Sequence, residues 1–143
     1  MSESYSVIYS QPAKDDLMEI YTYIAFNLQM PDIAEGQVNR IRQAVRSLNF
    51  MPSRYVNVEW EPWKSMGMHQ VPVDNFVVYY LVNDEEHTVS IIRIFYSGQD
   101  IEGIIKQERD NPLKSKGEQT DPESSGGEIA VFLLRVLQAP FIT

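Results

Sequence analysis

The apolar side chains of the first fifty residues change from the spacing of a strand to that of a helix. Residues 5–10 alternate along the chain and contain the β-branched and aromatic types that favour a strand. From Pro12, apolar residues recur every three or four positions, which predicts an amphipathic helix ending near residues 27–30. A second such pattern from Pro31 to Asn49 predicts an antiparallel partner helix. The expected buried faces are Ala13, Leu17, Ile20, Ile24 and Leu28 in the first helix, and Ala34, Val38, Ile41, Val45 and Leu48 in the second.

Polar residues add detail to both predicted helices. Pro12 suits a first helical turn, and we expect Asp15 and Asp16 to complement the positive end of the helix dipole. In the second helix, we expect the side chains of Arg40, Arg42 and Arg46 to lie mostly on the solvent side.

After Met51 and Pro52 the pattern is that of strands. The predicted strands are residues 55–60, 66–73, 76–82 and 88–96. Asp74 and Asn75 tolerate positive φ and predict a tight hairpin turn between the second and third of these. The unbroken apolar run of residues 76–82 is typical of a central strand covered on both faces. Residues 100–109 are expected to form a last short helix.

The composition divides the chain into a domain of residues 1–110, a flexible linker of residues 111–128 and a short apolar tail of residues 129–143. The linker contains two prolines, three glycines and hardly any apolar residue. The tail places several apolar side chains on one helical face but is too short to span a bilayer. Its role stays open, and one hypothesis is that it docks on its own or a neighbouring domain and competes with a partner protein.

The overall composition excludes several classes of protein. The chain has 143 residues, 43% of them hydrophobic, which fits one compact domain. The absence of cysteine excludes a disulfide scaffold, a thiolate metal site and a cysteine nucleophile. His69 and His87 do not have the spacing of a zinc site, so we expect neither a metal nor another cofactor. No apolar run approaches the ~20 residues of a membrane span, and no signal peptide is evident, so we expect a cytoplasmic protein without membrane contact.

The net charge of -8, from 12 basic and 20 acidic residues, has the wrong sign for a protein whose whole surface binds nucleic acid. Any such contact must therefore be local. Four arginines within fifteen residues form a candidate basic patch for RNA or for an acidic segment of a partner protein: Arg40, Arg42, Arg46 and Arg54. For the first three, a solvated helix face is the alternative interpretation.

Four phrases follow one another in the predicted order of strand, helical hairpin and three-stranded meander: DDLMEIYTYI, NRIRQAVRSLNFMPSRY, VPVDNFVVYYLV and IIRIFYSGQDI. With this order the chain resembles, over roughly residues 5–105, the RelE/ParE superfamily of toxins from bacterial type II toxin-antitoxin modules. The resemblance implies an α+β fold in which a small twisted antiparallel sheet packs against an N-terminal helical hairpin. It also implies a cognate antitoxin that wraps the toxin. Members of the superfamily are either ribosome-dependent messenger-RNA endonucleases or inhibitors of DNA gyrase.

Cleavage of RNA by its own 2'-hydroxyl requires a base, a cation beside the phosphorus and an acid for the leaving oxygen, but no metal. Arg93 matches the arginine of the superfamily's last strand and can pair with phosphate through two nitrogens, although an ion pair to a nearby carboxylate is the alternative. Tyr96 stands where many relatives carry a histidine or tyrosine. Because it lies three positions after Arg93, the two face opposite ways on a regular strand, and convergence requires a bulge or a turn. His69 is a possible third catalytic residue, with an exposed strand position as the alternative.

Three functions remain open at this stage. The first is a metal-independent endonuclease that cleaves messenger RNA on the ribosome, and this is the interpretation we favour from sequence. The second is a gyrase inhibitor without nuclease activity, and the third is a degenerate toxin that only binds its antitoxin. His69, Gln70 and Gln99 stand where close relatives carry cations, which gives weight to the last two. The oligomeric state stays open.

Overall fold

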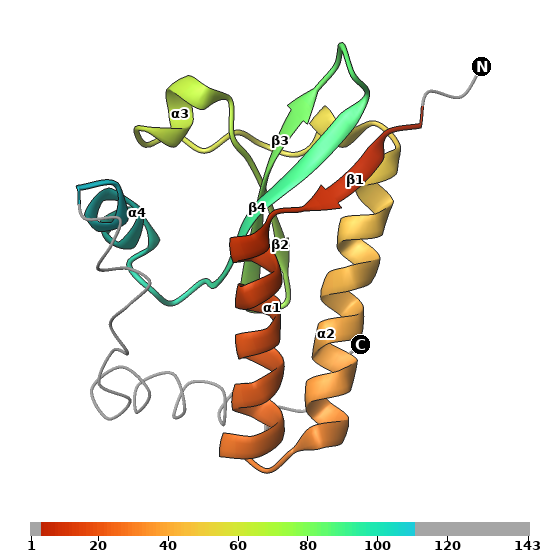
Figure 1. Cartoon of the computed structure of the whole chain (residues 1–143), viewed down its shortest axis with the longest axis vertical. Coiled ribbons are helices and arrows are strands. Elements are labelled where there is room, and N and C mark those ends of the chain that lie inside the picture. The colour runs from red at the N-terminus through yellow and green to blue at the C-terminus, as the bar shows by residue number, and fades with distance from the viewer. Residues whose placement is uncertain (1–3, 111–143) are drawn as a thin grey trace. The chain divides into compact units, whose positions relative to one another are not determined.

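The computed structural model describes residues 4–110, which fall into two compact units divided between Ser97 and Gly98. The first unit contains, in chain order, β1 (Ser6–Tyr9), α1 (Gln11–Thr22), α2 (Pro31–Arg46), α3 (Trp63–Met66), β2 (His69–Val73), β3 (Phe76–Asn83) and β4 (Thr88–Tyr96) (Figure 1). The second unit contains α4 (Ile101–Asp110), which confirms the predicted last helix. The predicted linker and tail, residues 111–128 and 129–143, lie outside the described residues. No helix in the described part of the chain is long and apolar enough to cross a membrane.

The predicted helical hairpin is confirmed. Ser10 caps α1 by accepting a hydrogen bond from the backbone N–H of Ala13, and α1 continues into a π-helical turn at Tyr23–Asn27. α2 follows from Pro31, and a short 3-10 helix, Ser47–Asn49, extends it to the predicted end. The prediction that Asp15 and Asp16 complement the helix dipole is wrong, because the first turn of α1 contains no acid.

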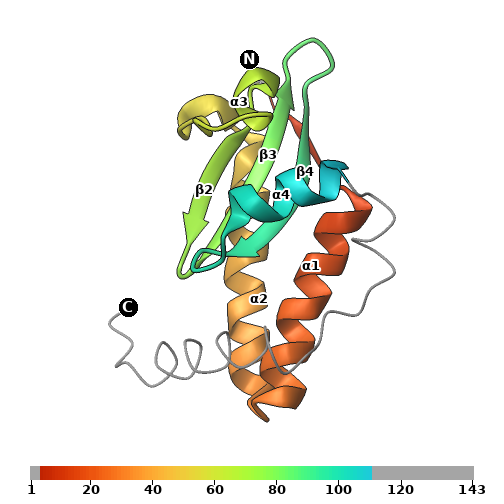
Figure 2. The ribbon, with the colours of Figure 1, turned by 90° about the vertical axis from the view of Figure 1, so that its left-hand side faces the viewer.

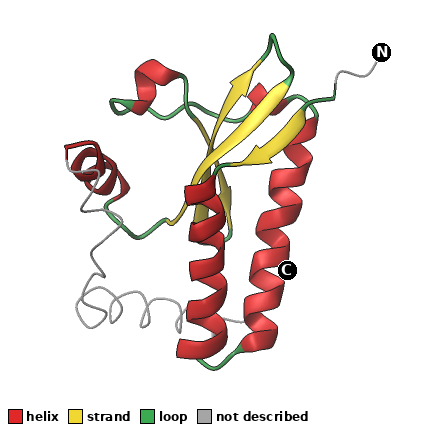
Figure 3. Ribbon diagram, viewed as in Figure 1, coloured by secondary structure: helices red, strands yellow, loops and turns green. Residues whose placement is uncertain are grey.

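The four strands form one sheet in the order β1-β4-β3-β2 (Figure 3). β2, β3 and β4 are an antiparallel meander, and Asp74 adopts a positive φ of 56° in the predicted turn. β1 runs parallel to β4. The α+β class and its sheet with a helical hairpin are therefore confirmed, but the sheet is mixed and not wholly antiparallel. α2 runs behind β2 and β3 in the view of Figure 2.

The core lies between the hairpin and one face of the sheet. Strand register places Val78 opposite Ile94 and Tyr80 opposite Ile91 on this face, and all four are buried. The helices contribute their predicted apolar stripes, of which the most buried members are Ala13, Ile24, Ala34, Ile41 and Leu48, each with 0% exposure. Ile20 and Leu28 are only half-buried at the margin of the predicted stripe. The phase of both helices is thus correct as predicted.

The segment between the hairpin and the meander differs from its prediction. Residues 55–60 are not a strand: only Asn57 forms an isolated antiparallel bridge, to His69. The following residues form the short helix α3, whose Trp63 is buried. β2 consequently begins at His69, three residues later than predicted.

Candidate functional site

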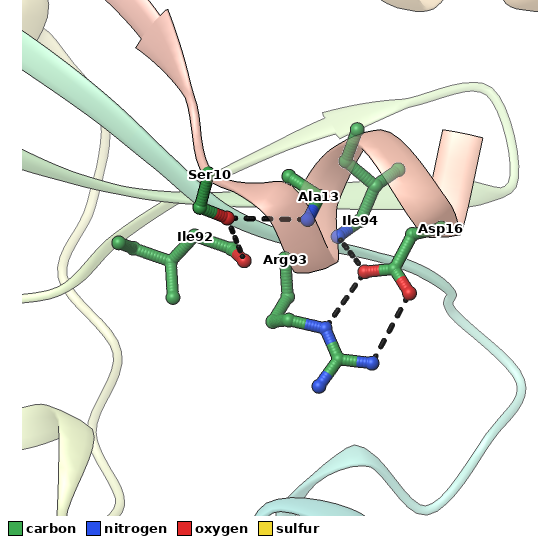
Figure 4. A network of polar contacts seen from close by, with 6 residues as sticks. All are labelled: Ser10, Ala13, Asp16, Ile92, Arg93 and Ile94. Atoms are coloured by element: carbon green, nitrogen blue, oxygen red, sulfur yellow. Dashed lines mark hydrogen bonds and ion pairs between the residues drawn. The ribbon is translucent and has the colours of Figure 1, made fainter. Parts of the chain in front are cut away.

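The arginine that the sequence singles out, Arg93 on β4, lies in an ion pair with Asp16 of α1 (Figure 4). Its Nε donates to Oδ2 of Asp16 at 2.7 Å and its Nη2 to Oδ1 at 3.1 Å, so the pair is bidentate. The side chains are 17% and 12% exposed, respectively. The sequence left two interpretations of Arg93, a phosphate-binding group and a partner in an ion pair, and the structure contains the ion pair.

The position of Asp16 follows from how the chain leaves β1. β1 ends opposite Ile91, and beyond that point α1 takes its place beside β4. The Ser10 hydroxyl donates to the carbonyl of Ile92, and Asp16 Oδ2 accepts the backbone N–H of Ile94 at 3.0 Å (Figure 4). The carboxylate of Asp16 thus accepts hydrogen bonds from two groups. One is the guanidinium of Arg93, and the other is the backbone N–H of Ile94, which has no strand beside it at this point.

Arg93 shares its sheet face with a row of aromatic side chains. Its guanidinium lies 4.5 Å from the ring centroid of Phe95, in the geometry of a cation–π contact. Phe95 is 6.3 Å from Tyr79, and Tyr79 is 4.7 Å from Trp63, measured between ring centroids. Trp60 stacks on Trp63 at 4.9 Å. On the sheet face opposite the hairpin, the surroundings of Arg93 are therefore apolar.

Tyr96 lies on the other face of the sheet. It is opposite Phe76 in the register, whereas Arg93 is opposite Tyr79, three positions further along β3. β4 does contain a bulge, but the extra residue is Ile92, which precedes Arg93 and leaves the spacing from Arg93 to Tyr96 unchanged. Tyr96 is 8% exposed, packs against Phe76 and has a pKa raised by burial.

His69 lies at a third place, at the start of β2. Its ring stacks on Tyr80 with centroids 5.2 Å apart, and Nδ1 lies 2.9 Å from the carbonyl oxygen of Tyr55. Tyr80 in turn donates its hydroxyl hydrogen to the carbonyl of Pro52 at 2.6 Å. The three candidate catalytic residues thus occupy separate environments, and register alone places Arg93 and Tyr96 on opposite faces.

Two of the four candidate patch arginines have structural partners. Arg40 pairs with Asp74 at 2.7 Å, and the same carboxylate oxygen accepts from the buried Gln37, which ties α2 to the β2–β3 turn. Arg54 donates to the carbonyl oxygens of Phe50 and Met51 and so satisfies backbone groups that follow the helix end. Arg42 and Arg46 are exposed as expected, and the side chain of Arg40 is 41% exposed although it pairs with Asp74.

Arg42 and Arg46 are exposed on the last turns of α2. Their charges act on the hydroxyl of Tyr9, where they oppose the rise in pKa that burial causes. Among residues 4–110, neither arginine has an ion-pair or hydrogen-bond partner for its side chain. Within the same residues, no three histidine, aspartate or glutamate side chains are grouped as a metal ion would require.

The family described as "ParE toxin of type II toxin-antitoxin system, parDE" matches residues 7–101. The chain belongs to this family of toxins. The match covers the sheet, the hairpin and Arg93, and it confirms the resemblance to the RelE/ParE superfamily. No curated protein sequence matches the chain.

The comparison with solved structures concerns the fold. The chain is similar to a structure described as the chromosomal ParDE system of P. aeruginosa, with a TM-score of 0.54 and 22% identity over 66% of this chain and 98% of that one. A RelBE toxin-antitoxin complex from Mycobacterium tuberculosis has a TM-score of 0.48 and 21% identity, covering 67% and 94% of the two chains. An archaeal RelE-RelB complex from Pyrococcus horikoshii has a TM-score of 0.48 and 14% identity, covering 67% and 98%. At these identities the likeness concerns the fold alone.

The residue of this toxin that sequence reasoning missed is Asp16. The sequence leaves a carboxylate partner for Arg93 open, but the position of Asp16 near the start of a helix favours a role at the helix dipole. Asp16 lies 77 positions from Arg93, and nothing local to either residue indicates that they meet. The only available signal was the presence of an acid on the sheet-facing half of a helix, one position before the buried Leu17.

The toxin should lose stability in alkali through its buried phenols. Burial raises the pKa of Tyr79 to about 12, from an ordinary value of 10.0. Below pH 10 this phenol is neutral in both the folded and unfolded chains, so its contribution is fully present. Between pH 10 and 12 only the unfolded chain loses the proton, and stability falls as pH rises. Urea unfolding at pH 9 and 11 should show a smaller decrease for Tyr79→Phe than for the wild type, and equal decreases would contradict the expectation.

Proposed function

We propose that this protein is the toxin of a type II toxin-antitoxin module and that it acts by binding DNA gyrase, without cleaving RNA. The observation that carries the proposal is the separation of Arg93, Tyr96 and His69. Arg93 and Tyr96 lie on opposite faces of the sheet, and His69 stacks on Tyr80 at the start of β2. An acid-base set has to reach one phosphate together, so this separation favours the non-nuclease alternative.

The electrostatics of Arg93 support the same conclusion. A cation stabilises the phosphorane only if its charge and donors are available to the phosphate oxygens. In this toxin, two donor nitrogens of Arg93 are engaged by the carboxylate of Asp16 in a pair that is mostly removed from solvent. Tyr96 is poorly suited to donate a proton to a leaving oxygen, because burial raises its pKa further above neutrality.

The net charge supports a protein target over an RNA surface. A toxin that acts on ribosome-bound RNA approaches a dense array of phosphates, and a net charge of -8 opposes that approach. The ParE family match and the gyrase inhibitors of the wider superfamily together suggest gyrase as the target. A cognate antitoxin is part of the proposal, since the similar solved structures are described as toxin-antitoxin systems or complexes.

Purified toxin should inhibit supercoiling by gyrase, and induction in cells should lead to cleaved DNA while transcripts stay intact. Coexpression with the antitoxin should abolish both effects. The matched measurement is the mapping of transcript ends after induction of the wild type and of Arg93→Ala. Discrete cuts within translated transcripts that decrease roughly 10²- to 10³-fold in Arg93→Ala would overturn the proposal in favour of the nuclease.

A further inference from the structure

The charges of the helical hairpin are divided between its two ends. Residues 15–35 contain five acids and no lysine or arginine, whereas residues 36–58 contain four arginines and no acid. Within the basic segment, Arg42 and Arg46 are exposed near the C-terminal end of α2. Because they lie four positions apart, their side chains project from the same side of the helix. They give a protein of net charge -8 a local positive surface.

Helix stabilisation accounts for only one of these two arginines. Arg46 occupies the last turn of α2, where a cation complements the negative end of the helix dipole. Arg42 lies a full turn earlier, beyond the range of that effect. β1 passes beside the end of α2 and contains no acid that could pair with either arginine (Figure 1). Burial raises the pKa of Tyr9 on β1, and both arginines act against that rise, which is consistent with their standing close together.

An exposed apolar loop follows the two arginines along the chain. Phe50 is 55% exposed and Met51 is 60% exposed. The loop backbone is held in place, because Arg54 donates to the carbonyl oxygens of both residues and the hydroxyl of the buried Tyr80 donates to the carbonyl of Pro52. Met51 adopts a positive φ of 48°, which is uncommon for a residue other than glycine. The fold therefore presents Phe50 in a fixed position, which lowers the entropic cost of binding.

This combination of side chains suits a nucleic-acid backbone. The planar guanidinium of arginine binds phosphate oxygens through two nitrogens, and exposed apolar side chains contact sugars and bases. Two such arginines are too few to hold DNA against a net charge of -8. The surface can therefore act only on DNA that another protein already holds, and the proposed target, gyrase, is such a protein.

We propose that the surface formed by Arg42, Arg46 and Phe50 contacts the DNA held by gyrase, so that the toxin binds the gyrase–DNA complex more tightly than gyrase alone. The inference rests on the proposed function, because it adds a second contact to the same target. Cleaved DNA accumulates only if the toxin binds the cleaved complex more tightly than the intact one. A contact whose strength depends on the DNA supplies such a difference in affinity.

The dissociation constant of the full toxin for gyrase, measured with and without a duplex that gyrase can cleave, tests this contact. For the wild type, the duplex should lower the constant about tenfold or more. Arg42→Gln with Arg46→Gln should lose most of that decrease but bind gyrase alone within about threefold of the wild type. The matched control is Lys14→Gln with Lys64→Gln, which removes the same charge at two other exposed positions and should keep the decrease. Thermal midpoints of both variants should match that of the wild type, because all four positions are exposed.

Salt distinguishes phosphate contacts from apolar ones. In the presence of the duplex, the loss of two phosphate contacts should reduce the slope of log affinity against log salt concentration by about 2. Arg42→Lys with Arg46→Lys keeps both charges and should keep the slope. Phe50→Ala should diminish the effect of the duplex and leave the slope unchanged. Its control is Phe26→Ala, which removes a ring that is 67% exposed at the opposite end of the hairpin.

The outcomes separate the inference from the function on which it rests. Equal affinity of the wild-type toxin for gyrase with and without the duplex would overturn the DNA contact and leave the gyrase assignment intact, as would equal losses in the two double glutamine variants. Weaker antitoxin binding by Arg42→Gln with Arg46→Gln, with the effect of the duplex unchanged, would assign the surface to an acidic protein segment instead. If the wild-type toxin bound gyrase under neither condition, the inference would fail together with the proposed function.

Discussion

Asp16→Ala is expected to destabilise the toxin by about 3–5 kcal/mol, because it removes the carboxylate from a largely buried ion pair. The charge of Arg93 would remain in a position that is only 17% exposed, and the N–H of Ile94 would lose its acceptor. These two costs act at the same point of β4, where α1 replaces the missing strand. The expected effect is therefore well above that of an exposed salt bridge, for which about 0–1 kcal/mol is usual.

Urea unfolding of Asp16→Ala beside Asp15→Ala measures this effect. Asp15 is the adjacent residue, is exposed and, within the described part of the chain, accepts a hydrogen bond only from Gln11, so its removal should cost less than about 1 kcal/mol. Asp16→Asn should fall between the two variants, because an amide oxygen can still accept from Ile94 while the charge is lost. Equal midpoints for Asp16→Ala and Asp15→Ala would contradict the account of this pair.

A double replacement separates the pair from its charges. Asp16→Leu with Arg93→Met substitutes apolar side chains of comparable size for both charges, so no buried charge is left without its partner. This variant should recover much of the stability that Asp16→Ala loses, since apolar replacements of buried ion pairs are often neutral or better. Unfolding as severe as that of Asp16→Ala would instead assign the effect to the lost acceptor for Ile94.

The parts of the fold that depend on a repeating pattern were predictable from sequence. Burial recurs every three or four residues along α1 and α2, so the pattern itself carries the helix phase. The β2–β3 turn was predictable because Asp74 and Asn75 favour positive φ. The unbroken apolar run of β3 likewise indicated a strand with neighbours on both sides, which its position in the sheet order bears out.

Features without a local pattern were not predictable. The direction of β1 relative to β4 depends on the path of the whole hairpin, and strand alternation is the same for a parallel or an antiparallel neighbour. α3 has four residues, too few for helical periodicity to appear. Residues 55–60 contain the residue types of a strand, but there the chain protects the edge of β2 through single hydrogen bonds.

In the candidate site, too, features with a local sequence pattern were predictable and features without one were not. The opposite orientation of Arg93 and Tyr96 followed from counting positions along one strand, and the structure agrees because its bulge lies before both residues. The partner of Arg93 could not be derived, since the pairing with Asp16 requires the docking of α1 onto β4. The same holds for Arg40 and Arg54, whose contacts with Asp74 and with Phe50 exist only once α2 is in place.

Ile41→Ala is expected to cost about 2–5 kcal/mol, which is the range for large-to-small changes at fully buried positions. Ile41 has 0% exposure in the middle of α2, and removing three of its carbon atoms loses apolar burial and leaves a cavity between the hairpin and the sheet. Alanine favours the helix, so the loss reports on packing and not on helix propensity.

Met18→Ala on α1 is the matched control, because Met18 is 63% exposed and should change stability by less than about 0.5 kcal/mol. Chemical unfolding of both variants compares them directly. If Ile41→Ala were as stable as Met18→Ala, the face of α2 that packs on the sheet would have to be a different one.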